Sequence, residues 1–168
     1  MEKFKEIDVL SLNANPFRLI GKDWMLVTAK KGDKVNTMTA SWGGMGVLWG
    51  KNVAYVVIRP QRYTKEFIDK EGKFSLCFFE ESYKEVLSLC GKVSGRETDK
   101  IKECNLTTNY YKGIPYFEEA SLVLICSTLY QNTISKEGFQ DEKMIDTYYP
   151  DNDFHEMYIG KIEAVLKK

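Results

Sequence analysis

Long apolar segments of strand character dominate this chain, and no regular series of helices separates them. β-Branched and aromatic residues, which favour strands, are concentrated in six segments: Trp24–Ala29, Val35–Trp42, Asn52–Ile58, Lys73–Phe79, Ala120–Asn132 and Phe154–Leu166. A doubly wound parallel sheet would need a crossover helix after almost every strand. The sequence therefore predicts a mainly β fold, an antiparallel barrel with short inserted helices.

Two short helices are expected between these strands. Thr64 is the predicted N-cap of a helix that runs through Asp69. Ser82 and Glu85 have the spacing of a capping box. That box would open a helix ending near Gly91, a residue that can take the left-handed conformation beyond a helix end.

Three further segments have less regular patterns. The polar loop 94–101 leads to another short helix, residues 110–116 look rich in turns, and residues 135–153 read as loop with one helical turn. Gly43 and Gly44 interrupt the second strand, which indicates a bulge or a close approach of backbone.

Length and charge limit the classes of function. The 168 residues predict one domain spanning residues 1–168, and the formal net charge of zero gives no long-range attraction to nucleic acid or to an anionic membrane. No apolar run approaches the roughly 20 residues of a membrane span. The N-terminus also lacks the apolar core of a signal peptide, so a cytoplasmic location is expected.

The cysteines and the aromatic residues allow two further expectations. Cys77, Cys90, Cys104 and Cys126 have neither metal-ligand nor redox spacing, so we expect reduced, non-catalytic thiols. A neutral chain with many aromatic residues would be prone to self-association unless a dimer buries some of them.

Residues 36–64 carry most of the functional information. Thr37, Thr39 and Ser41 share one face of a strand, where they either line a polar wall or face solvent. Trp42 and Trp49 then flank a glycine-rich stretch. Their indoles could stack on a flat heterocycle, lie at a subunit interface or fill the core.

A basic turn follows the third strand. Arg59 and Arg62 precede the predicted helix start at Thr64, so two guanidinium groups and free helix amides could bind a phosphate. The alternative is a pair of surface arginines that bridge to acidic neighbours. Arg96 and Lys100 belong to a second basic loop, which could equally be a solvated loop and helix cap.

His155 is the only histidine, which excludes a site with several histidine ligands, and no metal site is predicted. His155 could donate a proton near a reacting ring, or it could be an exposed residue at a strand start. Neither a phosphate-binding Walker loop nor a dinucleotide fingerprint is present.

The chain resembles the flavin reductase-like family, whose members bind FMN in a split β-barrel, and in particular its flavoredoxin-type branch. Five stretches carry the resemblance in the family's order: Asn15–Thr28, Asn36–Gly44, Ile58–Thr64, Ser94–Arg96 with Asp99–Lys100, and His155–Gly160. Each stretch alone is loose, whereas the ordered set covers nearly the whole chain.

The resemblance implies a homodimer with one FMN per subunit near the dimer interface. It implies that Thr39, Ala40, Ser41 and Trp42 lie along the ring and ribityl chain of the flavin. It also implies that Arg59, Tyr63 and Thr64 hold the phosphate, with Lys100 joining from the second loop. His155 matches a position near the flavin face.

Three functions remain open at this point. The first is an NAD(P)H-dependent oxidoreductase that passes electrons from NADH or NADPH through bound FMN. The second is a flavoredoxin-like electron-transfer protein that exchanges electrons with a redox partner protein and has no NAD(P)H activity of its own. The third is a split barrel that binds another planar cofactor such as haem, with His155 as axial ligand.

Overall fold

The computed structural model describes residues 3–168, and its main element is one antiparallel sheet. The strands are β1 (Lys5–Ile7), β2 (Met25–Lys31), β3 (Lys34–Ala40), β4 (Gly43–Leu48), β5 (Lys51–Ile58), β6 (Lys73–Phe78), β7 (Thr108–Tyr111), β8 (Ile114–Phe117), β9 (Leu122–Thr133) and β10 (Glu156–Lys167). The α-helices are α1 (Pro16–Arg18), α2 (Tyr63–Glu71), α3 (Lys84–Lys92), α4 (Lys100–Glu103) and α5 (Glu142–Tyr148).

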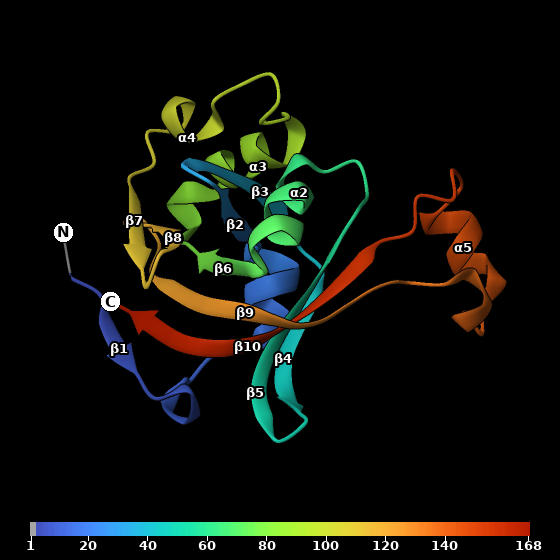
Figure 1. Ribbon diagram of the computed structural model, residues 1–168, viewed down its shortest axis with the longest axis horizontal. Coiled ribbons are helices and arrows are strands. Elements are labelled where there is room, and N and C mark those ends of the chain that lie inside the picture. Colours follow the sequence, from blue (N-terminus) through green and yellow to red (C-terminus); the bar gives the residue numbers. More distant parts are fainter. Residues whose placement is uncertain (1–2) are drawn as a thin grey trace.

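The eight-stranded sheet has the order β3-β2-β6-β9-β10-β5-β4, with β1 added beside β10. Every pairing in it is antiparallel. A separate hairpin joins β7 and β8. Figure 1 shows α2, α3 and α4 together on one side, whereas α5 lies at the far end of the molecule, between β9 and β10. The prediction of a mainly antiparallel β fold with short helices is confirmed.

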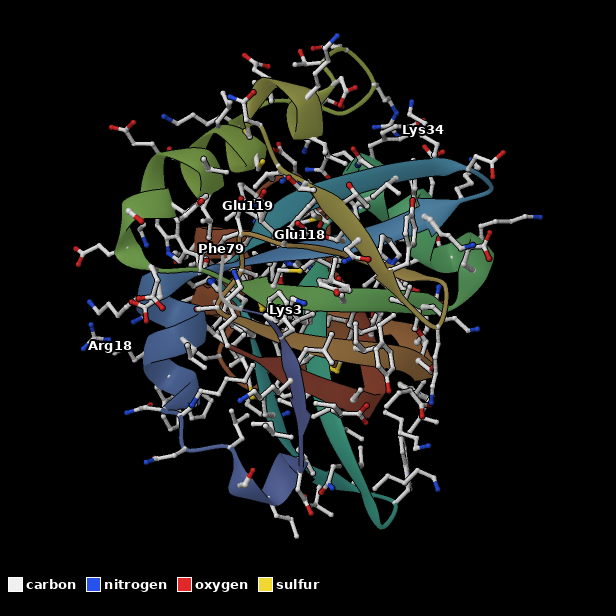
Figure 2. All side chains as sticks on the ribbon, turned by 90° about the vertical axis from the view of Figure 1, so that its left-hand side faces the viewer. Lys3, Arg18, Lys34, Phe79, Glu118 and Glu119 are labelled. Atoms are coloured by element: carbon white, nitrogen blue, oxygen red, sulfur yellow. The ribbon has the colours of Figure 1, made fainter. Side chains whose placement is uncertain are left out.

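The central strands read as continuous apolar runs because both of their faces are buried. In β2, Met25 and Val27 belong to one core cluster and Leu26 to the other. β6 and β9 alternate between the same two clusters, so successive side chains fill opposite sides of the sheet. Figure 2 shows side chains filling the space on both sides of the strands. Phe67 of α2 covers the first side, and Leu87 of α3 covers the second.

The glycine-rich stretch that was expected to end a strand forms a strand of its own. Gly43–Leu48 is β4, and it pairs with β5 through a two-residue turn in which Trp49 has φ 52° and Gly50 has φ 65°. The predicted close approach of backbone is confirmed, since a Cβ added at Gly43 would lie 2.3 Å from the Tyr55 carbonyl oxygen.

The helix ends differ from the sequence predictions. Thr64 is not an N-cap but the second residue of α2, which begins without a side-chain cap. Ser82 lies in a 3₁₀ turn before α3, and Tyr83 occupies the N-cap position without a capping bond, so no capping box forms. Gly91 lies inside α3. The Thr64 hydroxyl accepts instead from Asn36 of β3, a partner that local spacing does not reveal.

Residues 110–116, predicted as turns, belong to the β7–β8 hairpin, whose turn residues Lys112 and Gly113 both have positive φ. The expected loop at 135–153 contains α5, which extends over two turns rather than one. Among the described residues, no helix is both long and apolar enough to traverse a lipid bilayer.

Candidate functional site

A small pocket lies where β5 ends and α2 begins, and we call it the cation pocket. Its volume is about 200 Å³, and its lining includes Asn36, Arg62, Thr64, Gly95 and Lys100. It lies between β3, the start of α2 and the loop that follows α3. The pocket therefore combines segments that are distant in the sequence.

Two cations of this pocket are held by the end of α3. Arg62 Nη1 donates to the Gly91 carbonyl at 2.8 Å, and Lys100 Nζ donates to the Cys90 carbonyl at 3.0 Å. The C-terminal end of a helix carries partial negative charge, which favours cations there. Burial lowers the pKa of Arg62, and it lowers the pKa of Lys100 to about 8.

The positive charge of the pocket has no acidic counterpart. Within residues 3–168, neither Arg62 nor Lys100 forms an ion pair with a carboxylate, and the buried Nη2 of Arg62 has no hydrogen-bond partner. The first turn of α2 adds backbone N–H groups without a side-chain cap. Buried charges are normally paired, so this arrangement is suited to an anionic group from a ligand.

A second pocket, which we call the aromatic pocket, adjoins the first. Its volume is about 270 Å³, and it is lined by residues 38–42 together with Val57, Arg59, Arg62 and His155. Met38 and Arg62 line both pockets, so the two are neighbours. Because β3 is a terminal strand of the sheet, its free edge can present backbone groups to a ligand along this wall.

His155 is buried at the back of the aromatic pocket, with 7% of its surface exposed, so the alternative of an exposed strand-start residue is wrong. Its Nδ1 lies 2.8 Å from the Tyr149 hydroxyl, and its ring centroid lies 5.0 Å from that of Trp42. Burial, aided by the charge of Arg59, lowers the pKa of His155 to about 4. The imidazole is therefore neutral at pH 7.

Arg59 lies on the side of His155 rather than beside Lys100. Its Nη1 forms an ion pair with Asp153 at 2.6 Å, and its Nη2 donates to the Tyr148 carbonyl at 2.8 Å. Arg59 lines the aromatic pocket but not the cation pocket. The two arginines of the basic turn thus lie in different surroundings. Arg59 has protein partners for both terminal nitrogens, whereas Nη2 of Arg62 has none among the described residues.

Most of the remaining predicted site residues line one of the two pockets. Thr39, Ala40, Ser41 and Trp42 line the aromatic pocket, and Tyr63, Thr64 and Lys100 line the cation pocket. Thr37 lies in neither, because its buried hydroxyl contacts the Thr28 hydroxyl at 2.9 Å and donates to the Val27 carbonyl. Arg96 also points elsewhere: it pairs with Glu66 at 2.5 Å and stacks on Tyr63.

Sequence reasoning missed several residues of the site. Asn36 lies within the cation pocket and donates from Nδ2 to Thr64 Oγ1 at 2.9 Å. Tyr149 and Asp153 contact His155 and Arg59 from a segment that was read as polar loop. The only available signal was the aromatic content of that segment, since Phe139, Tyr148 and Tyr149 are unusual in a solvated loop.

Solved structures of similar fold extend over nearly the whole chain. An FMN-binding protein from Thermus thermophilus, with bound p-hydroxybenzaldehyde, is 21% identical, with a TM-score of 0.70 over 98% of this chain and 82% of that one. A flavoredoxin from Methanosarcina acetivorans is 22% identical, with a TM-score of 0.68 over 96% and 76%. The flavin reductase of styrene monooxygenase from Pseudomonas putida S12 is 15% identical, with a TM-score of 0.62 over 85% and 77%.

These likenesses confirm the fold class, an antiparallel split β-barrel with short inserted helices of the type found in FMN-binding proteins. A comparison with curated proteins gave no match. The model of the flavin reductase like domain matches residues 17–167, which is most of the sequence. The chain therefore belongs to the flavin reductase-like domain family.

Proposed function

We propose that this protein binds FMN and acts as an NAD(P)H-dependent, flavin reductase-like oxidoreductase. The observation that carries the proposal is the uncompensated positive charge of the cation pocket, where Lys100 is buried, Arg62 is half-buried and the buried Nη2 of Arg62 lacks a partner. A phosphate ester would supply the missing anion and acceptors. The adjoining aromatic pocket, with Trp42 and His155, has the position expected for the flavin end.

The relatives support the same cofactor. Thermus thermophilus contributes a structural neighbour described as FMN-binding, and flavin reductases and flavoredoxins occur among the others. FMN supplies the hydride and electron chemistry when it is bound, while the protein holds, orients and electrostatically tunes it. In this assignment Arg62, Lys100, Thr64 and the start of α2 bind the phosphate, and Thr39–Trp42 line the flavin.

We also propose a homodimer. A groove of about 690 Å³ adjoins the aromatic pocket and shares Ser41 and Trp42 with it. Large apolar side chains on β4, on the β4–β5 turn and on β9 are exposed as well, among them Val47, Trp49 and Tyr130. A second copy that covers this surface would shield the flavin end from water, as the family resemblance leads us to expect.

Binding of FMN and of riboflavin, which lacks the phosphate, tests the assignment of the cation pocket. We expect Arg62→Ala to weaken FMN binding at least about tenfold, since a hydrogen bond to a charged group contributes about 1.5–3 kcal/mol, and to leave riboflavin binding nearly unchanged. Arg96→Ala is the matched control, because Arg96 belongs to the same region but pairs with Glu66. Flavin fluorescence quenching gives both affinities.

Equal FMN affinity in the wild type and Arg62→Ala, or a larger loss in Arg96→Ala, would contradict the assignment. The electron donor is then tested by anaerobic titration of the FMN-loaded protein with NADH and NADPH in turn. Loss of the oxidised flavin absorbance with either nucleotide supports the reductase. If neither reduces the flavin, the flavoredoxin-like alternative takes its place.

A further inference from the structure

The hydroxyl of Tyr149 is fixed in space by its surroundings. Tyr149 is 5% exposed and stacks on Phe154 with ring centroids 4.7 Å apart. Phe139 packs against the same ring, and the Arg59 guanidinium lies 5.3 Å from its centroid on the ring face. The hydroxyl is therefore held at 2.8 Å from His155 Nδ1 by packing that does not depend on this bond.

The protons of this pair can be assigned by counting donors and acceptors. Burial raises the pKa of the Tyr149 phenol and lowers that of His155 to about 4, so at pH 7 the phenol keeps its proton and the imidazole carries one. The backbone N–H of His155 is a donor to the Tyr149 oxygen, and within residues 3–168 the only acceptor bonded to the hydroxyl proton is His155 Nδ1. A buried hydroxyl proton without an acceptor is costly.

One tautomer satisfies both groups. If the hydroxyl donates to Nδ1, the imidazole proton lies on Nε2, and Nε2 has no partner among the described residues. If Nδ1 carried the proton instead, the hydroxyl proton would be left without an acceptor. From the cost of an unsatisfied buried donor, we expect the first arrangement to exceed the second by about tenfold or more.

The two charged groups beside the ring act in opposite directions on the pKa of His155, and the lowering by Arg59 exceeds the raising by Asp153. Arg59 faces His155 from the end of β5 and Asp153 faces it from the loop before β10, and these two form an ion pair with each other at 2.6 Å. Trp42 covers the ring from the segment after β3. The carboxylate is thus engaged by Arg59, and the imidazole has no free anion beside it to hold a second proton.

We propose that Tyr149 is a positioning residue that fixes His155 as a neutral Nε2–H donor, directed at a hydrogen-bond acceptor of the ligand in the aromatic pocket. The acceptor is a carbonyl oxygen or ring nitrogen at the edge of a planar heterocycle. The tautomer stands on the protein alone, whereas the identity of this ligand as a flavin rests on the proposed function. His155 then serves as a fixed dipole and not as a source of protons.

The single histidine makes the tautomer directly measurable. In the ¹⁵N-labelled protein without flavin, long-range ¹H–¹⁵N correlation spectra at pH 7 should show a protonated, pyrrole-like Nε2 and an unprotonated, pyridine-like Nδ1. Tyr149→Phe keeps the ring packing and should give averaged nitrogen shifts from two exchanging tautomers. Tyr148→Phe is the control, because the Tyr148 ring also contacts Trp42 but no bond joins its hydroxyl to His155.

A wild-type spectrum with protonated Nδ1 would overturn the proposal, as would a Tyr149→Phe spectrum identical to that of the wild type. If Tyr149→Phe fails to fold, the wild-type spectrum alone decides. These spectra need no cofactor, so they stay valid even if the protein does not bind FMN.

The flavin provides a second readout. A fixed N–H donor at the edge of the heterocycle stabilises the electron-rich reduced form. Tyr149→Phe and His155→Leu should therefore lower the reduction potential of bound FMN, and His155→Gln, which retains an N–H donor, should restore part of the loss. Unchanged potentials in both Tyr149→Phe and His155→Leu would overturn the assigned role toward the ligand.

Discussion

At the scale of single residues, the two cations of the cation pocket lack, among the described residues, an anionic partner that a ligand could supply. Arg62 and Lys100 are bound by successive carbonyls at the end of α3, and neither meets a carboxylate in the part of the chain that the structure describes. Helix carbonyls offset only part of the cost of burying charge. A bound phosphate would offset more of that cost, so binding should also stabilise the fold.

Lys100 should make FMN affinity depend on pH. Its pKa in the ligand-free protein is about 8, below the unperturbed value near 10.4. Affinity should therefore be highest below pH 8 and fall, by up to about tenfold per pH unit, as the pH rises and the ammonium loses its proton before binding. Lys100→Met should bind FMN more weakly at pH 7 and lose this dependence, as fluorescence titrations across pH 7–9.5 would show.

The stability of the ligand-free protein should change in the opposite direction. Because burial depresses the folded-state pKa of Lys100, the unfolded chain holds more protons between pH 8 and about 10.4, and this group then adds stability as the pH rises. Denaturant unfolding of wild type against Lys100→Met measures the difference. Lys102→Met, an exposed lysine on the same short helix, is the control, and the same pH profile in both variants would refute the role of Lys100.

Residue type and spacing predicted which residues line the site better than they predicted which of their polar atoms lack a hydrogen-bond partner. The sequence placed Arg59 and Arg62 in one basic turn, but only the fold brings Asp153 to Arg59 and leaves Nη2 of Arg62 without a partner. Thr37 and Thr39 likewise share one face of β3, yet the Thr37 hydroxyl is paired with Thr28 of the neighbouring strand and the Thr39 hydroxyl donates to the Leu87 carbonyl. Such partners are distant in sequence, so local patterns cannot reveal them.

At the scale of elements, the loop between α3 and α4 shapes the cation pocket by close contact with β3. A Cβ added at Gly95 would lie 2.0 Å from Oδ1 of the buried Asn36, whose Nδ2 donates to Thr64 at the start of α2. The loop, the strand and the helix start are therefore linked through one amide side chain. The glycine is required by this approach and not by an unusual φ.

Gly95→Ala should disturb all three elements together. We expect a loss of about 1–3 kcal/mol in unfolding free energy from overpacking and about a tenfold loss of FMN affinity from the broken Asn36–Thr64 bond. Gly46→Ala in β4 is the matched control, since nothing lies within 4 Å of its added Cβ. Thermal unfolding and FMN titration check both effects, and equal behaviour of the two variants would contradict the predicted contact.

Strands buried on both faces were predictable, because their apolar runs are long and need no partner to be recognised. β4 was missed since Gly43, Gly44 and Gly46 lack strand propensity, and its formation depends on pairing with β5. Tyr55 explains why glycine is needed at position 44, because its ring occupies the space that a side chain there would need. Helix caps failed for a similar reason: Thr64 Oγ1 accepts from Asn36 instead of from its own helix.

At the scale of the whole molecule, the exposed apolar surface is the feature that one chain alone does not explain. Trp49 is 57% exposed at the tip of the β4–β5 hairpin, with its ring 6.1 Å from that of Tyr130 on β9. Met45 and Tyr55 of the same hairpin line the apolar groove next to the aromatic pocket. A continuous apolar surface beside a ligand site is typical of an interaction face, and we assign it to the proposed second copy.

Trp49→Asn separates the stability of one chain from the association of two. Trp49 and Gly50 both have positive φ, which asparagine tolerates far better than tryptophan in a two-residue hairpin turn. Each chain of the variant should therefore be at least as stable as a wild-type chain. The loss of a large apolar contact between chains should raise the dissociation constant of the dimer by about tenfold or more. Sedimentation equilibrium over a range of concentrations measures this, with Leu10→Asn, which removes an 85% exposed leucine near the N-terminus, as control. A wild-type protein that stays monomeric at micromolar concentrations with FMN bound would refute the dimer, and equal dissociation of Trp49→Asn and wild type would place the interface elsewhere.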